Sequence, residues 1–313
     1  MTERSITLLG AGTIGASWAA LFLSYGEKVR IYDPDENALL NVKTYIEQAW
    51  NDLTSLMPDL HVVLWEDLLL TQDLERACQG AVWVQENAPD DLDIKHRLLS
   101  DTECVLEKHI PIVSSTTALR ASDIQVEMKH PDRFIVGHPF NPPHLIPLVE
   151  VVAGKKTDPE LTERAKVFYE SYGKEVIIPK REVIGHIANR LNAALYREVV
   201  HMVATGIATV EDIDRAIVHG PGLRWAFLGP NLVYHLGGGD GGYAHYLDHL
   251  GPSQEARWKD LGEAALSDET KEKLINGLTE TIGEASITDL RAERDTAIIG
   301  LLKLKKDLNG SAT

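Results

Sequence analysis

The sequence contains few of the features that mark secreted, membrane-spanning or metal-binding proteins. Its 313 residues include only two cysteines, Cys78 and Cys104, and these form neither a zinc-binding pattern nor a disulfide framework. No stretch approaches the run of about 18 apolar residues that a membrane-spanning helix needs, and the N-terminus carries no signal-peptide pattern. We therefore predict a cytoplasmic protein with two reduced thiols, no membrane association and no bound metal.

Basic residues are fewer than acidic residues. Lys and Arg number 31 against 47 Asp and Glu, which gives a formal net charge of −16 with histidine neutral. Such an excess of negative charge disfavours binding to nucleic acids and to anionic membrane surfaces. The apolar share of 44% is ordinary for a globular protein, and the length is typical of about two domains. We therefore expect a small molecule as the partner rather than a polyanion.

The N-terminal segment has the order strand, glycine-rich turn, helix, strand and acid. Residues 6–9 and 29–32 are the expected strands, and residues 10–15 match the pattern G-x-G-x-x-G. Glycines at these positions let the backbone approach a pyrophosphate, which the helix N-terminus then attracts. Asp33 would accept hydrogen bonds from the adenosine ribose and repel a 2′-phosphate, so the sequence predicts NAD rather than NADP. The residues expected to bind the cofactor here are Gly10, Gly12, Thr13, Ile14, Gly15 and Asp33.

Strands continue beyond this unit, and polar clusters follow their ends. A helix is expected at 36–57, and strands are expected at 81–84, 110–113 and 134–137. In open parallel sheets, ligands bind outside the carboxyl ends of the strands. We therefore expect three polar clusters to converge at one sheet edge, namely Gln85 with Glu86, Ser115 to Thr117, and His138.

His138 and Glu150 are the expected catalytic pair. Glu150 is the only acid in a valine-rich strand, where a carboxylate is costly to bury unless it is paired. Imidazole titrates near neutral pH, so His138 can take a hydroxyl proton while the carboxylate stabilises the imidazolium. The alternative is a core histidine bonded to a backbone carbonyl. The buried acid and the neighbouring cofactor strands favour the catalytic pair.

Together these segments resemble the L-3-hydroxyacyl-CoA dehydrogenase family over nearly the whole chain. The motifs that carry the resemblance are residues 10–15 (GAGTIG), 85–86 (QE), 114–117 (SSTT), 137–142 (GHPFNP), 148–151 (LVEV), 185–191 (GHIANRL) and 220–224 (GPGLR). The resemblance implies that His138 and Glu150 form the catalytic dyad. It also implies that Asn189 and the Thr117 hydroxyl contact the substrate oxygens, and that Glu86 and Lys95 lie near the nicotinamide-ribose end of NAD.

Two of these assignments have structural alternatives. The family usually has serine where this chain has Thr117, so the hydroxyl is kept but a methyl is added. The alternative to a substrate contact is that Thr117 caps the end of a strand and that Asn189 is a residue of a helix start.

The second part of the chain has helical spacing and no clear strands. We predict an α/β fold in which a Rossmann-type, doubly wound sheet domain at 1–184 binds NAD and an all-helical domain occupies 185–313. In the family that the chain resembles, the helical domain closes over the substrate and builds the interface of a homodimer.

Residues 223–239 resemble the branch of the family that acts on small free hydroxy acids. The acyl-CoA enzymes usually have a proline-methionine-glycine-proline segment that this chain lacks. Arg224 suits a substrate carboxylate, and aromatic side chains suit a trimethylammonium group through cation–π attraction. The aromatic candidates are Trp225, Phe227, Tyr234, Tyr243 and Tyr246.

This branch makes oxidation of L-carnitine to 3-dehydrocarnitine the leading expectation. L-gulonate and a short 3-hydroxyacyl group, free or as its CoA ester, are the alternative substrates. The alternative to substrate binding is that the aromatic side chains pack in the core and that Arg224 donates hydrogen bonds to helix carbonyls. A crystallin-like structural protein and an NAD-binding module without turnover remain open as non-enzymatic alternatives, and both are disfavoured by the joint presence of His138, Glu150 and Asn189.

Overall fold

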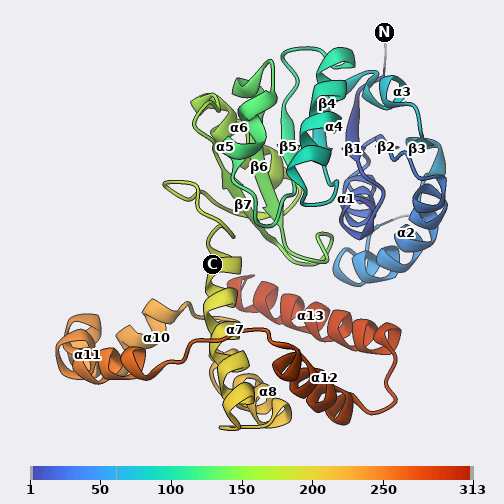
Figure 1. Cartoon of the computed structure of the whole chain (residues 1–313). Coiled ribbons are helices and arrows are strands. Elements are labelled where there is room, and N and C mark those ends of the chain that lie inside the picture. Colours follow the sequence, from blue (N-terminus) through green and yellow to red (C-terminus); the bar gives the residue numbers. More distant parts are fainter. Residues whose placement is uncertain (1–2, 61, 311–313) are drawn as a thin grey trace. The chain divides into compact units, whose positions relative to one another are not determined.

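The computed structural model describes residues 3–60 and 62–310 (Figure 1). The chain divides into two compact units. The sheet unit comprises the described residues up to Arg190 and those from Ala292 onward, and the helical unit comprises Leu191–Arg291. The expected boundary near residue 184 stays a prediction.

The sheet unit is built on one eight-stranded sheet with the order β3-β2-β1-β4-β5-β6-β7-β8. Neighbouring strands are parallel except for β6 and β7, which are antiparallel. The mostly parallel sheet followed by helices confirms the predicted fold class. The strands are β1 Ser5–Leu9, β2 Val29–Tyr32, β3 Leu68–Thr71, β4 Ala81–Glu86, β5 Ile112–Ser114, β6 Phe134–Pro139, β7 Leu148–Val152 and β8 Glu175–Ile177.

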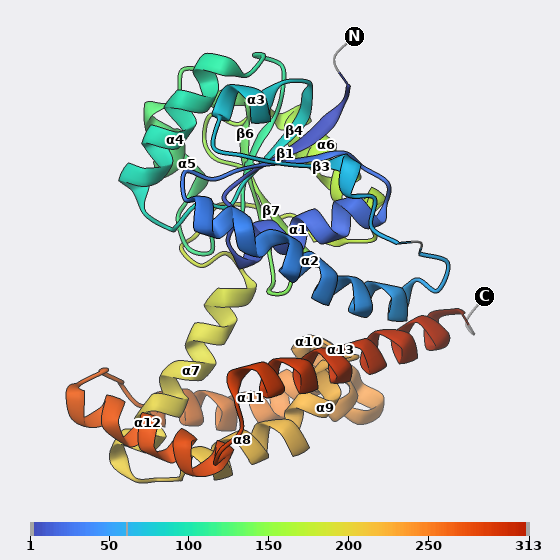
Figure 2. The same cartoon turned by 90° about the vertical axis from the view of Figure 1, so that its right-hand side faces the viewer.

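Helices cover both faces of this sheet, as Figure 2 shows. One face carries α1 (Thr13–Ser24), α2 (Glu36–Leu56) and α6 (Pro159–Ser171), with a core that includes the aromatic residues Trp18 and Phe22. The short helices α3 (Leu74–Cys78) and α5 (Ala121–Ile124) cover the other face with α4 (Leu92–Val105), over a second core. Central strands buried on both faces read as continuous apolar runs, which is why β1 and β6 were predictable from the sequence.

Helices alone follow β8 in the described part of the chain. The helices are α7 Ala188–Thr205, α8 Val210–His219, α9 Pro221–Trp225, α10 Pro230–Gly237, α11 Gly242–Asp260, α12 Asp268–Ile282 and α13 Ile287–Gly310. Short 3-10 turns lie at Trp65–Asp67, Gln125–Glu127, Pro131–Arg133 and Gly239–Gly241. None of the described helices is both long and apolar enough to cross a membrane.

Candidate active site

The turn between β1 and α1 has the geometry that a bound pyrophosphate needs. Gly10 has φ +106°, a conformation that favours glycine, and a Cβ at Gly15 would lie 2.0 Å from the Gly10 carbonyl oxygen. A Cβ at Gly12 would meet no described atom within 4 Å, so this glycine faces open space. The first turn of α1 contains no acid and no side-chain cap. Its N–H groups and the helix dipole therefore remain available to phosphate oxygens.

A pocket of about 690 Å³ adjoins this turn and suits an adenosine moiety. Asp33 lies at the pocket wall, where its carboxylate accepts hydrogen bonds from the backbone N–H groups of Ala11 (2.8 Å) and Asp35 (2.9 Å). These two bonds fix the carboxylate and leave it acceptor capacity for ribose hydroxyls. Arg30 is turned away and donates to the Arg76 carbonyl at 2.9 Å.

The charge of this pocket is negative on balance. Three carboxylates line it, Asp33, Asp35 and Asp101, against the one guanidinium of Arg97. The Nε of Arg97 donates to a backbone carbonyl of its own helix. A further phosphate on the ribose would therefore meet net repulsion.

The carboxyl ends of β4 and β5 hold a buried ion pair. The Lys95 ammonium lies 2.8 and 2.9 Å from the two carboxylate oxygens of Glu86, and both side chains are almost fully buried. Ser114 donates to the same carboxylate, and so does the backbone N–H of Ala88. The structure thus brings Glu86 and Lys95 together beside the loop that follows β4. Their role toward the nicotinamide ribose stays a prediction.

A hydrogen-bond network joins the three strand ends that the sequence predicted to converge. Ser115 accepts from Gln85 at 2.9 Å and donates to Asn87 at 2.7 Å. Gln85 also reaches the carbonyl oxygen of Gly137 on β6, and the Tyr169 hydroxyl donates to Gln85 at 2.6 Å. β4, β5 and β6 therefore share one polar layer at their carboxyl ends. Sequence reasoning did not single out Asn87 or Tyr169.

His138 and Glu150 lie directly opposite each other because of the strand register. In the antiparallel pair of β6 and β7, these two residues are partners, and side chains at such positions lie on one face of the sheet. His138 Nδ1 is 2.9 Å from Glu150 Oε2, and both side chains are buried. A carboxylate only accepts, so Nδ1 carries a proton, and in the neutral ring Nε2 then has the free lone pair.

The other oxygen of Glu150 is bound by backbone. Oε1 accepts hydrogen bonds from the N–H groups of Ile187 at 2.9 Å and Ala188 at 3.2 Å, at the start of α7. Burial raises the pKa of Glu150, but the bonds from His138 and from these two N–H groups outweigh it and hold the pKa below its ordinary value. Glu150 is therefore a carboxylate that stays ionised although it is fully buried. Backbone N–H donors cannot be recognised from residue types in the sequence. The only sequence feature that indicates this turn is Gly185, shortly before the start of α7.

Asn189 lies next to the free nitrogen of His138 and is bonded to the backbone of Thr117. The Asn189 Nδ2 is 3.4 Å from His138 Nε2 and donates to the Thr117 carbonyl at 3.4 Å. The Thr117 N–H is held by Asp90 at 2.8 Å, and the residue is exposed. An amide donor thus lies beside the base nitrogen, at the place where a substrate oxygen would have to sit, and the role of the Thr117 hydroxyl stays a prediction.

The residues expected to bind the rest of the substrate all lie in the helical unit. Arg224 is exposed on α9, and its guanidinium has no hydrogen bond or ion pair within the described chain. Trp225 and Phe227 are exposed by 44% and 45%. Tyr234 stacks on Tyr246 at 4.6 Å between ring centroids. Of the five aromatic candidates, only Tyr246 is buried, so it fits the core-packing alternative better than the others do.

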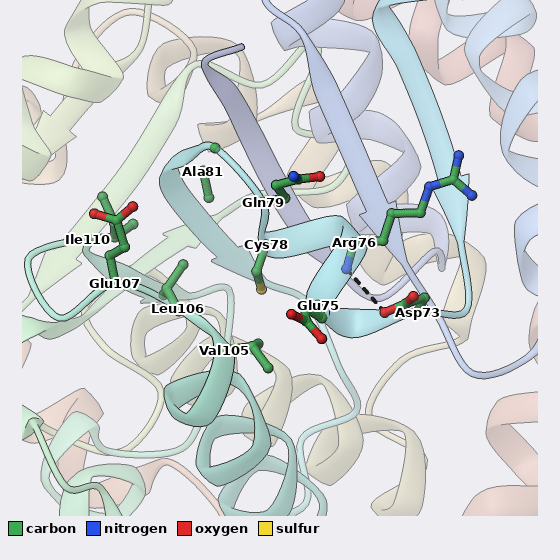
Figure 3. Close-up of a pocket in the computed structure, with 11 residues that line it drawn as sticks. Asp73, Glu75, Arg76, Cys78, Gln79, Ala81, Val105, Leu106, Glu107 and Ile110 are labelled. Carbon is green, nitrogen blue, oxygen red and sulfur yellow. Dashed lines mark hydrogen bonds between the residues drawn. The ribbon is translucent and has the colours of Figure 1, made fainter. Parts of the chain in front are cut away.

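A second pocket, of about 580 Å³, lies next to the amino ends of β4 and β5, whereas the polar clusters lie at the carboxyl ends of the strands (Figure 3). Cys78 and the flanking Asp73 and Glu107 are among its lining residues. Burial raises the pKa of the Cys78 thiol to about 12, so the thiol is not a nucleophile near neutral pH. Among the described residues there is no group of His, Cys, Asp and Glu side chains that would hold a metal ion.

The sheet, its glycine-rich turn and the buried His138–Glu150 pair define a nicotinamide-dependent dehydrogenase domain. Residues 5–183 match the 3-hydroxyacyl-CoA dehydrogenase, NAD binding domain, and residues 185–276 match the 3-hydroxyacyl-CoA dehydrogenase, C-terminal domain. The chain belongs to the 3-hydroxyacyl-CoA dehydrogenase family, whose members are NAD-dependent dehydrogenases acting on CH–OH groups, and its cofactor is NAD.

Similar proteins cover nearly the whole chain. The L-carnitine dehydrogenase of Streptomyces coelicolor is 44% identical over 96% of this chain and 94% of its own. That of Oceanobacillus iheyensis is 37% identical over 97% and 99%. Among solved structures, an NAD⁺-dependent dismutase, FHMPC 5-dehydrogenase, has a TM-score of 0.83 and 25% identity over 96% of this chain and 98% of that chain. FadB2 of M. tuberculosis has a TM-score of 0.64 and 25% identity over 74% and 82%.

Proposed function

We propose that this chain oxidises the secondary hydroxyl of a small 3-hydroxy acid with NAD, and that the substrate is L-carnitine, which yields 3-dehydrocarnitine. The observation that carries the proposal is the buried His138–Glu150 pair, on β6 and β7 of the sheet whose strand β1 leads into the NAD turn, with Asn189 beside the free nitrogen of His138. The choice of L-carnitine is supported by several relatives of that activity that align over nearly the full length.

The proposal gives each residue of this group a role. His138 Nε2 takes the proton of the substrate hydroxyl as the O–H bond breaks and the C=O bond forms. When bound, NAD supplies the nicotinamide ring that accepts the hydride from the carbinol carbon. Glu150 holds the Nδ1–H and stabilises the positive charge that appears on the imidazole. Asn189 Nδ2, 3.4 Å from Nε2, donates to the substrate oxygen and orients it toward the base.

The expected site for the rest of the substrate needs a cation and an aromatic wall. Carnitine carries a carboxylate at one end and a trimethylammonium group at the other. Arg224 would pair with the carboxylate, since its guanidinium has no protein partner within the described chain. Exposed rings such as Trp225, Phe227 and Tyr234 would face the quaternary ammonium, a contact worth about 2 kcal/mol when desolvated.

A substrate comparison tests this proposal. NADH formation is measured with L-carnitine, L-gulonate, 3-hydroxybutyrate and 3-hydroxybutyryl-CoA at one pH and one NAD concentration. We expect the highest kcat/KM with L-carnitine. A clear advantage for gulonate or the CoA ester would overturn the substrate assignment and leave the dehydrogenase assignment standing. No turnover of any hydroxy acid, with NADH binding intact, would favour the structural or NAD-binding alternatives.

A homodimer is also part of the proposal. The helical unit exposes many large apolar side chains, more than single scattered positions require. They include Leu195, Leu232, Leu247, Trp258 and Leu278. A second copy of the chain is the expected cover for this surface. Analytical ultracentrifugation at micromolar protein should give twice the mass of the chain, and a stable monomer would contradict the proposal.

A further inference from the structure

Three hydrogen bonds join the turn after β5 to the turn that begins α7. The N–H of Gly185, the Nε2 of His186 and the side-chain amide of Asn189 bond to the carbonyl oxygens of residues 118, 116 and 117, in that order, at 3.4, 3.1 and 3.4 Å. A carbonyl only accepts, so the Nε2 of His186 carries the proton. The His186 bond is the shortest of the three and the only one made by a ring.

The backbone at this point is unusual. His186 has φ +49°, the only left-handed non-glycine residue in the described chain, and it follows Gly185 at φ +75°. This region is sparsely populated by residues with a Cβ, although histidine is among the more tolerant ones. The turn brings the next two N–H groups, those of Ile187 and Ala188, onto Glu150 Oε1. Successive N–H groups arranged in this way form a cradle for an anion.

The His186 ring is buried beside the catalytic histidine. Only 1% of the residue is exposed, its ring centroid lies 5.0 Å from that of His138, and its Nδ1 has no partner within the described chain. Burial lowers the pKa of His186, the Thr116 carbonyl partly offsets this, and the nearby charges are those of His138, Glu150 and Asp90. The ring therefore stays neutral, so it does not compete with His138 for the proton of the substrate.

We propose that His186 is a positioning residue for the dyad. Its bond to the Thr116 carbonyl fixes the left-handed turn, and the turn holds the Ile187 and Ala188 N–H groups on Glu150. Loss of the ring would loosen this cradle and leave Glu150 with the bond from His138 alone. The carboxylate would then protonate more readily, because hydrogen bonds from N–H groups favour its charged form. Only the kinetic part of the test below rests on the proposed dehydrogenase function.

The first test follows the titration of Glu150 itself, without substrate. The full chain is labelled with ¹³C at the glutamate carboxyl carbon, and the Glu150 signal is assigned by its absence from Glu150→Gln. In His186→Phe, which keeps a ring but no donor, we expect the pKa of Glu150 to rise by about one pH unit. His96→Phe is the matched control, because it removes a ring bond of 3.0 Å to the Asp123 carbonyl and should leave the Glu150 titration unchanged.

The second test is kinetic. We expect kcat of His186→Phe to fall by about 10- to 100-fold, with NADH affinity unchanged. The acid-side loss of activity should move to higher pH, since Glu150 must be ionised to act. His186→Asn should restore much of kcat, because asparagine tolerates the left-handed region and carries an N–H donor.

The outcomes separate the proposals. An unchanged Glu150 titration in a variant that lacks the ring would overturn the positioning role, even if activity fell. If His186→Phe does not fold, His186→Gly decides, because glycine adopts the turn and removes the bond without adding bulk. A raised Glu150 pKa in a protein that oxidises no hydroxy acid would support the positioning role and contradict the proposed function.

Discussion

At the scale of single residues, the site depends on a charge kept where water cannot reach it. A buried carboxylate is costly unless it is paired and hydrogen-bonded, and Glu150 receives three hydrogen bonds, from His138 and two backbone N–H groups. The histidine partner was predictable, because an acid in an apolar strand needs a cationic or donor neighbour. The backbone donors were not, because N–H groups are the same at every residue and only folding selects two of them.

Asp33 should set the choice between NAD and NADP. In Asp33→Ala the ribose loses its acceptor and the repulsion of a 2′-phosphate falls, so we expect the ratio of kcat/KM for NAD over NADP to drop at least about tenfold. Asp33→Asn removes the charge but keeps an oxygen for the Ala11 N–H, and should fall between the parent and Asp33→Ala. The measurement is steady-state kinetics with both cofactors. A parent that prefers NADP would contradict the assignment.

At the scale of elements, the antiparallel step from β6 to β7 builds the dyad. The connection between these strands is residues 140–147, which is shorter than the dozen or more residues that a parallel crossover needs. Its length alone therefore predicts an antiparallel pair, and the register then places His138 opposite Glu150. The edge strands β3 and β8 were missed, because they are short and only partly buried and so lack a long apolar run.

The glycine-rich turn offers a pair of substitutions with opposite effects. Gly15→Ala places a methyl 2.0 Å from a backbone oxygen, so we expect a loss of about 1–3 kcal/mol in the free energy of unfolding. Gly12→Ala meets no described atom and its φ of −68° suits alanine, so stability should hold while NADH affinity falls. Thermal denaturation and NADH fluorescence titration measure the two effects. Unchanged NADH affinity in Gly12→Ala would place the pyrophosphate elsewhere.

Lys174, just before β8, supports the connection between β6 and β7. Its buried amine donates to the carbonyl oxygens of Pro143 and Ile146 and lies 5.6 Å from the centre of the Trp18 ring. Burial lowers the pKa of Lys174 to about 7 from the ordinary 10.5. Between these values the unfolded chain binds more protons than the folded chain, so this group makes folding more favourable as pH rises.

Lys174→Met should therefore weaken the pH dependence of stability. Between about pH 7 and about pH 9, the parent is expected to gain more free energy of unfolding than the variant does, by up to about 1.4 kcal/mol for each pH unit. Urea denaturation at both pH values measures this difference. Lys180→Met, at an exposed lysine, should behave like the parent. Parallel curves for parent and Lys174→Met would show that the buried amine does not titrate in this range.

At the scale of the whole molecule, the class of fold was easier to predict from the sequence than the residues that bind the substrate beyond the His138–Glu150 pair. The Rossmann-type order of elements repeats a local pattern of strand, turn and helix, which each segment signals by itself. The residues expected to bind substrate beyond the dyad, such as Arg224 and Trp225, belong to the helical unit. Their signal is compositional, since an exposed arginine near exposed aromatic rings is found in many helical surfaces. Their role therefore stays a proposal.

Turnover of L-carnitine with NAD by the parent chain and by His138→Ala tests whether the His138–Glu150 pair catalyses the oxidation. Stopped-flow absorbance follows NADH formation, while fluorescence titration and thermal denaturation confirm that the variant binds NADH and is folded. We expect the parent to form NADH and His138→Ala to be slower by about 10²- to 10⁴-fold with NADH affinity kept. A folded His138→Ala that turns over at a rate within a few-fold of the parent would contradict this expectation.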